Sequence, residues 1–154
     1  MVKSKFGVGR DFQVLDANEQ QVYFVDGKYG LRPAAEIQDA SGAVVYTVRG
    51  KLMGIPKEMV LLDAQEQEVA RLKAKTFSIK NKMTLSAVDG REWQLEGNFL
   101  EKEYEVTSEG RVVLHITQKY MTIKDTYALD VAEDVDPAMA LAVLWAVDAF
   151  VEQR

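Results

Sequence analysis

The chain has 154 residues, long enough to bury a core of its own, and predicts a single domain spanning residues 1–154. Its 47% apolar and 28% charged residues are typical of a soluble globular protein, and its net charge of −5 argues against a general nucleic-acid binder. Cysteine is absent, which excludes disulfides, thiolate metal sites and thiol catalysis. We expect a cytoplasmic location and no transmembrane segment. The first residues lack the apolar run of a secretory signal, and no stretch reaches the roughly 18 apolar residues of a membrane helix.

Alternating apolar residues predict β-strands along most of the chain, from about residue 3 to residue 131. Eleven strands are clear, the first beginning at Phe12, and a further strand at residues 3–6 or 76–80 would make twelve. The others are marked by the pairs Tyr23/Val25, Ala35/Ile37 and Tyr46/Val48 and by segments centred on Leu61, Leu72, Leu85, Trp93, Tyr104, Leu114 and Tyr127.

A repeated sequence motif covers the turns between these strands and the strands that follow them. Each copy opens on an aspartate, followed by a short polar turn and an apolar run. The copies begin at Asp16, Asp39 and Asp63, and shorter echoes follow Asp89 and Glu109. Residues 22–28, for example, recur as residues 45–51 and, in weaker form, as residues 69–75. Tandem repeats with short connections predict β-hairpins that pair antiparallel as a meander.

The chain then ends in one apolar helix, expected at about residues 137–152. Asp136-Pro137 is a helix start, with Asp as N-cap and Pro at the first helical position, and residues 138–147 are all apolar. A helix that is apolar on all sides but too short to cross a bilayer belongs inside a protein. An open sheet of eleven or twelve strands would expose its edges. We therefore predict a mainly β fold, a single antiparallel twelve-stranded barrel of tandem hairpins enclosing the C-terminal α-helix.

Several phrases, in order, resemble the LURP-one-related family over about residues 6–150. They are Val-Tyr-x-Val-x-Gly-Lys, Leu-Glu-Gly-Asn-Phe at residues 95–99, Asp-Thr-Tyr-Ala-Leu-Asp at residues 125–130, and Ala-Leu-Ala-Val-x-x-Ala-Val-Asp at residues 140–148. The resemblance implies a tubby-like, twelve-stranded barrel around a central helix, similar in shape to tubby C-terminal and phospholipid scramblase domains. Because tubby relatives bind phosphoinositides and scramblase relatives are membrane-associated, it also implies lipid binding as a candidate role. No catalytic motif travels with the family.

His115 is the only histidine, and the alternation around it places its side chain outward. No sequence motif supplies the orienting carboxylate and nucleophile that a catalytic histidine needs, so we expect a surface residue. An acidic cluster consists of Asp130, Glu133, Asp134 and Asp136. It lacks the ligand ladder of a calcium loop and favours the positive end of the helix instead, so we expect no metal site.

Four lysines occupy equivalent positions in the repeats: Lys28, Lys51, Lys75 and Lys119. Gathered at one rim, they would attract an anionic head group, whereas the alternative is that they only blunt strand ends and keep the surface soluble. The Gly-Lys pairs at residues 27–28 and 50–51, and the glycines at residues 7 and 9, lack the spacing of phosphate-binding loops and are interpreted as turns.

Asp148 interrupts the apolar helix, and burying its carboxylate alone is costly. We expect it either to emerge at the mouth of the barrel or to meet a buried Arg, Lys, Tyr or backbone donor as a structural anchor.

These observations predict a non-catalytic binding or scaffolding domain, monomeric or homodimeric, without a cofactor. Its candidate partners are an anionic lipid or a protein, and not nucleic acid. They identify no catalytic, cofactor-binding or metal-binding residues and leave the ligand-binding residues unknown. The alternatives are an enzyme with a pocket between strands and a homo-oligomeric structural protein.

Overall fold

The computed structural model describes residues 2–6, 12–16, 18, 20–28, 34–50, 58–74, 82–99, 101, 103–117 and 126–152. These residues form twelve strands followed by one helix. The strands are β1 (Val2–Phe6), β2 (Phe12–Leu15), β3 (Gln21–Lys28), β4 (Ala34–Asp39), β5 (Val44–Gly50), β6 (Glu58–Asp63), β7 (Glu68–Ala74), β8 (Lys82–Ala87), β9 (Glu92–Asn98), β10 (Glu103–Ser108), β11 (Arg111–Thr117) and β12 (Thr126–Val131), and the helix is α1 (Pro137–Glu152).

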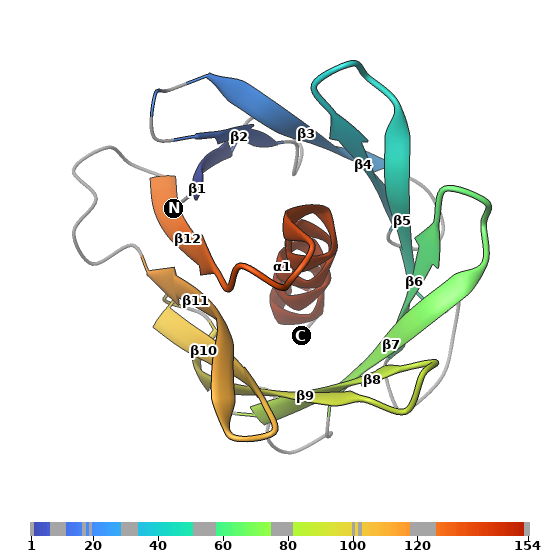
Figure 1. Ribbon diagram of the computed structural model, residues 1–154, viewed down its shortest axis with the longest axis vertical. Helices are drawn as coiled ribbons and strands as arrows, with labels where there is room; N and C mark the ends of the chain where they lie inside the picture. Colours follow the sequence, from blue (N-terminus) through green and yellow to red (C-terminus); the bar gives the residue numbers. More distant parts are fainter. Residues whose placement is uncertain are drawn as a thin grey trace.

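The strands form one antiparallel sheet in which each pairs with its neighbours in sequence. β1 pairs with β2 along one edge and with β12 along the other, so the order of neighbours is circular. In Figure 1 the strands surround α1, which starts beside the end of β12. The predicted mainly β fold, with one antiparallel sheet of hairpins and a C-terminal helix, is confirmed. The strand expected at residues 3–6 is present as β1, whereas residues 76–80 lie outside the described residues.

Five short turns lie together at one end of the sheet, because an antiparallel meander returns to the same end after every second strand. This turn end holds the connections β2–β3, β4–β5, β6–β7, β8–β9 and β10–β11, and also the link from β12 to α1. The opposite end of the sheet is the one at which β1, β3, β5, β7, β9 and β11 finish.

The repeated aspartates close the hairpins at the turn end. Oδ1 of Asp39 accepts hydrogen bonds from the backbone N–H of Ser41 at 2.9 Å and of Ala43 at 3.1 Å. Asp16 and Asp63 accept the same pair of bonds, from the residues two and four positions later. The aspartate side chain accepts hydrogen bonds from backbone N–H groups of the turn, which have no partner on a neighbouring strand. This role explains why each repeat begins with an aspartate.

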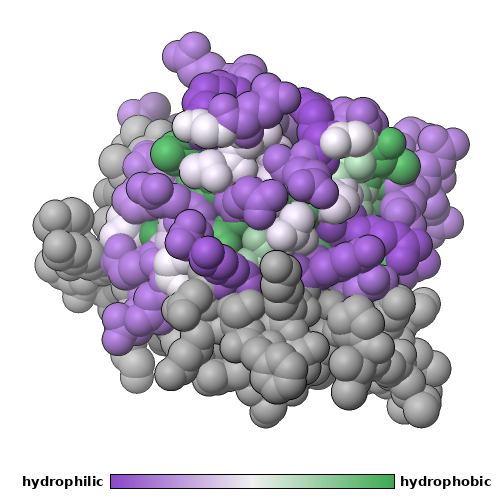
Figure 2. Space-filling model, turned by 90° about the horizontal axis from the view of Figure 1, so that it is seen from below, coloured by the Kyte–Doolittle hydropathy of each residue, from purple (hydrophilic) through white to green (hydrophobic). Residues whose placement is uncertain are grey.

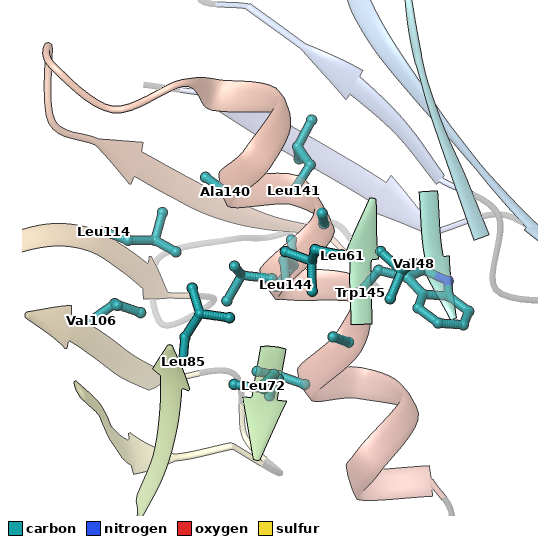
Figure 3. Close-up of a cluster of buried hydrophobic side chains, with 14 of the residues drawn as sticks. Val48, Leu61, Leu72, Leu85, Val106, Leu114, Ala140, Leu141, Leu144 and Trp145 are labelled. Atoms are coloured by element: carbon teal, nitrogen blue, oxygen red, sulfur yellow. The ribbon is translucent and has the colours of Figure 1, made fainter. Parts of the chain in front are cut away.

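The helix fills the space inside the sheet. Its side chains from Ala140 to Ala149 are all buried, on every side of the helix. Figure 3 shows Leu144 and Trp145 next to Leu61 and Val48, with sheet residues such as Leu85 contributed from another part of the ring. A helix apolar on all sides is stable only when enclosed, so the sheet and the helix share one core.

Gly27, Lys28 and Gly50, which we interpreted as turn residues, are instead the last residues of strands. Gly27 and Lys28 pair with Ala35 and Ala34 of β4, and Gly50 pairs with Met59 of β6. The prediction was wrong because each glycine was taken to end its strand. In the structure the backbone pairing with the next strand continues through Gly27 and Gly50. Gly7, Gly9 and Lys51 lie outside the described residues.

Candidate functional site

The aspartate that caps the helix is also joined to the sheet. Asp136 Oδ1 accepts a hydrogen bond from the N–H of Ala138 at 3.0 Å, and its backbone oxygen accepts one from Ala140 at 3.1 Å. Its second carboxylate oxygen, Oδ2, accepts a hydrogen bond from Tyr46 Oη at 2.8 Å. The predicted N-cap is confirmed, and the cap additionally ties the start of α1 to β5.

Two tyrosines from equivalent repeat positions lie near this cap, and both are half-buried. Burial is the main cause that raises the pKa of Tyr46, followed by the hydrogen bond to Asp136. Burial also raises the pKa of Tyr23, with smaller contributions from the charges of Asp136 and Asp39. Both phenols therefore remain protonated at neutral pH. Tyr46 uses its proton to donate the hydrogen bond to Asp136.

The rest of the predicted acidic cluster is divided among separate contacts. Asp134 forms a two-pronged ion pair with Arg111, with distances of 2.9 Å and 2.6 Å, and these bonds lower the pKa of the carboxyl. Asp130 lies opposite His115 in the register of β11 and β12, and the side chain of Glu133 is exposed. In the described part of the chain, no three His, Cys, Asp or Glu side chains are grouped so that they could hold a metal ion.

His115 lies on the outer face of β11, as its neighbours predicted. Leu114 and Ile116 are buried, while His115 is only partly buried. In the sheet register it lies between Glu105 of β10 and Asp130 of β12. The sequence could not show these two cross-strand neighbours, because strand pairing alone brings them beside the histidine.

Of the four repeat lysines, the structure describes Lys28. Its Nζ lies 2.6 Å from Asp26 and 3.3 Å from Glu36, and the hydrogen bond to Asp26 is the first cause of its raised pKa. Lys28 is therefore paired on the strand face. Lys51, Lys75 and Lys119 lie outside the described residues, so the rim of lysines stays a prediction.

Asp148 is buried inside the sheet, on the last turns of α1. The ring of Tyr104, on β10, is buried too, and its pKa is raised first by burial and then by the charge of Asp148. Of the two alternatives expected for Asp148, emergence at the mouth of the barrel or a buried position beside a donor, its burial agrees with the second. Tyr104 is not that donor, because its hydroxyl makes no hydrogen bond to Asp148, so the anchoring role stays a prediction.

Two arrangements were missed at the level of sequence. Gly97 pairs with Tyr104 across the sheet, and a Cβ at Gly97 would lie 2.7 Å from Tyr104 Cα, closer than real side chains come. The Tyr104 ring then packs edge-on against Phe99, with ring centres 4.9 Å apart. Two of the residues in the Leu-Glu-Gly-Asn-Phe phrase thus position this tyrosine, and an isolated glycine within a strand was the available signal.

The second missed arrangement is a charge network on the outer faces of β6 and β7. Arg71 bonds Glu68 through Nε at 2.7 Å and Nη2 at 2.8 Å, and it reaches Glu58 through Nη1 at 3.2 Å. The Glu58 side chain is only 7% exposed although it is charged, and Nζ of Lys73 lies 3.6 Å from its other carboxylate oxygen. The two cations offset the burial of the Glu58 carboxylate, and removing one of them would leave that buried charge poorly compensated.

The described surface is mainly polar. Figure 2 shows hydrophilic residues over most of the coloured part of one face, with hydrophobic residues between them as small separate spots. Val88 and Val112 are the large hydrophobic residues that are exposed among the described ones. No helix in the described ranges is long and apolar enough to span a bilayer.

Known proteins match this chain over nearly its whole length. The sequence family described as LURP-one-related matches residues 1–148. The Bacillus subtilis (strain 168) "Uncharacterized protein YxjI" is 24% identical over 149 residues, which cover 96% of this chain and 90% of the relative. The X-ray structure of a protein from Arabidopsis thaliana, AT5G01750, matches with a TM-score of 0.73 at 17% identity, covering 97% of this chain and 91% of that one. At this identity the structural likeness establishes a common fold alone.

Proposed function

Because this chain belongs to the LURP-one-related family, we propose that it is a non-catalytic binding domain of the tubby-like barrel type, formed by residues 1–154 as one unit. The circular strand order and the likeness to the Arabidopsis fold support this architecture. The helix fills the interior with its own side chains, which leaves the outside of the molecule for recognition. We further propose that its partner is an anionic membrane surface on the cytoplasmic side.

The observation that carries the proposal is the acidic character of the turn end, taken together with the distribution of basic residues along the sequence. The described residues at the turn end are predominantly acidic: Asp16, Asp39, Asp63, Asp89, Glu109, Glu133, Asp134 and Asp136, against Arg91 and Arg111. An anionic bilayer repels such an end. A chain of net charge −5 can bind anionic lipid only if its basic residues are concentrated elsewhere.

In the sequence, basic residues are concentrated in five segments that connect one strand to the next and that lie outside the described residues. Residues 7–11, 29–33, 51–57, 75–81 and 118–125 join β1–β2, β3–β4, β5–β6, β7–β8 and β11–β12. Their charged residues are Arg10, Arg32, Lys51, Lys57, Lys75, Lys80, Lys119 and Lys124, against Asp11 and Asp125. The same segments carry large apolar residues such as Leu52, Phe77 and Ile123. Basic residues interleaved with apolar ones are the composition of a peripheral membrane-binding surface.

The test is sedimentation with liposomes of neutral phosphatidylcholine, alone or mixed with phosphatidylserine or a phosphoinositide. We expect binding only to the anionic vesicles and a decrease with salt. Each lysine near an anionic surface contributes about 1 kcal/mol, so Lys51→Gln with Lys75→Gln should weaken binding roughly 30-fold.

The matched control removes the same charge from the turn end, as Arg91→Gln with Arg111→Gln. This variant should bind about as well as the original protein, because the charge is removed from the end that does not face the membrane. Equal loss in the two variants would show that only net charge matters, and absence of binding to every anionic vesicle would refute the lipid proposal. A defined dimer by light scattering together with no lipid binding would favour the homo-oligomeric alternative.

A further inference from the structure

One hydroxyl group in the core is without an evident partner. Tyr104 Oη is completely buried and makes no hydrogen bond with the described residues. Nearly all buried side-chain polar groups in folded proteins are hydrogen-bonded to protein or to an ordered water. A buried hydroxyl that lost its hydration without replacement would destabilise the fold, so this group calls for a bonding partner.

The ring cannot turn its hydroxyl toward solvent. The Tyr104 backbone lies against Gly97, where the missing Cβ lets the two strands approach, and the ring is held edge-on by Phe99. Its orientation is therefore fixed from two sides, and the hydroxyl is directed into the interior, where the residue is buried.

An acceptor lies nearby on the helix. Asp148 is buried, and its negative charge acts on Tyr104, whose pKa it raises in addition to the larger effect of burial. Asp148 also takes part in at least one further interaction. The phenol makes no hydrogen bond to this carboxylate, so a buried donor and a buried acceptor lie near each other without bonding directly.

We propose that a hydroxyl group binds between Tyr104 and Asp148, accepting a hydrogen bond from the phenol and donating one to the carboxylate. A hydroxyl has both a lone pair and a proton, as this position requires. An anion would be repelled by Asp148, and an ammonium ion has no lone pair to accept the phenol proton. The two sources of such a group are a resident water and a small alcohol. The inference is independent of the membrane proposal.

The sign of a stability change tests the inference. Tyr104→Phe keeps the ring and removes only the hydroxyl. If that hydroxyl is bonded to a resident group, the variant should melt about 2–4 °C lower, the shift of one ordinary hydrogen bond in a domain of this size. If the hydroxyl has no partner, removing it relieves a buried polar group, and the melting temperature should stay unchanged or rise. Tyr46→Phe, which removes a hydrogen bond seen in the structure, calibrates the size of the loss.

Two further measurements make the result specific to the site. In a double-mutant cycle, Tyr104→Phe should have a smaller effect in an Asp148→Asn background, because the bridging group needs the carboxylate. A high-resolution crystal structure should show density between the two side chains, with water and alcohol distinguished by its size and by mass spectrometry of extracts. An empty position in that map, or a Tyr104→Phe variant as stable as the original protein, would overturn the inference.

Discussion

Gly97 offers a direct test of how the sheet is packed. Its φ is +142°, a region that side-chain-bearing residues rarely adopt, and a Cβ there would lie 2.6 Å from the carbonyl oxygen of Glu103 and 2.8 Å from Tyr104 Cβ. The backbone strain of an alanine at such an angle is about 1–3 kcal/mol. The clash adds overpacking of about 1–3 kcal/mol, because backbone atoms of the neighbouring strand must move.

Gly97→Ala should therefore cost about 2–6 kcal/mol, a large part of the 5–15 kcal/mol that stabilises an ordinary domain. Urea unfolding followed by tryptophan fluorescence measures it. Gly42→Ala is the matched control, because Gly42 also has a positive φ, +89°, but nothing lies within 4 Å of its Cβ position. The control should show the strain alone. Equal losses in the two variants would refute the claim that Gly97 is required for the close approach of Tyr104.

Three other changes have defined outcomes. Glu66 has a φ of +61° at the turn position that favours glycine, so Glu66→Gly should raise the melting temperature by about 2–4 °C, and a decrease measured by calorimetry would contradict this. Asp136→Ala should cost about 2 kcal/mol in urea unfolding, more than Tyr46→Phe at about 1 kcal/mol, because it removes the helix cap as well as the shared hydrogen bond. The pKa of Asp39 is lowered by the hydroxyl and backbone N–H groups of its turn, and that of Asp134 by a guanidinium. Since both are depressed in the fold, their stabilisation is complete above the unfolded value of about 3.9 and is lost as pH falls through the folded values. Melting temperature should thus decline below about pH 4, and a flat profile down to pH 3 would be inconsistent with these contacts.

The elements most accessible from sequence were those set by local chemistry. The strands around Leu61, Leu85 and Leu114 were predicted from alternation alone, because one face of each is buried against the helix. The helix start was predicted from Asp136-Pro137, since capping depends on neighbouring residues. The repeated aspartates were recognised as hairpin residues for the same reason, although the sequence did not show which hydrogen bonds they make.

The contacts that could not be predicted depend on the pairing of one strand with another. Glu58 and Arg71 meet only because β6 pairs with β7 in one register, and nothing near Glu58 indicates that a charged residue there is buried. Gly50 was interpreted as a turn residue because its pairing with β6 is not visible locally. The candidate binding surface was predicted only as a set of lysines at equivalent positions of the repeats. Such equivalence indicates that the lysines follow corresponding strands, but it does not indicate which groups they contact.

Two aspartates, the N-cap Asp136 and the buried Asp148, limit the positions that the apolar surface of α1 would otherwise allow. Hydrophobic burial is non-directional, and a helix buried on all sides gains the same burial at many rotations and depths inside an apolar ring of strands. Polar groups are more selective, because a misplaced buried carboxylate loses its partners at a cost of several kcal/mol. Asp136 fixes the start of α1 to Tyr46 of β5, and Asp148 lies near its other end beside Tyr104 of β10. With one aspartate near each end, we expect the helix to favour a single axial position. We infer that the polar residues of this core contribute its uniqueness, while the apolar residues contribute most of its stability.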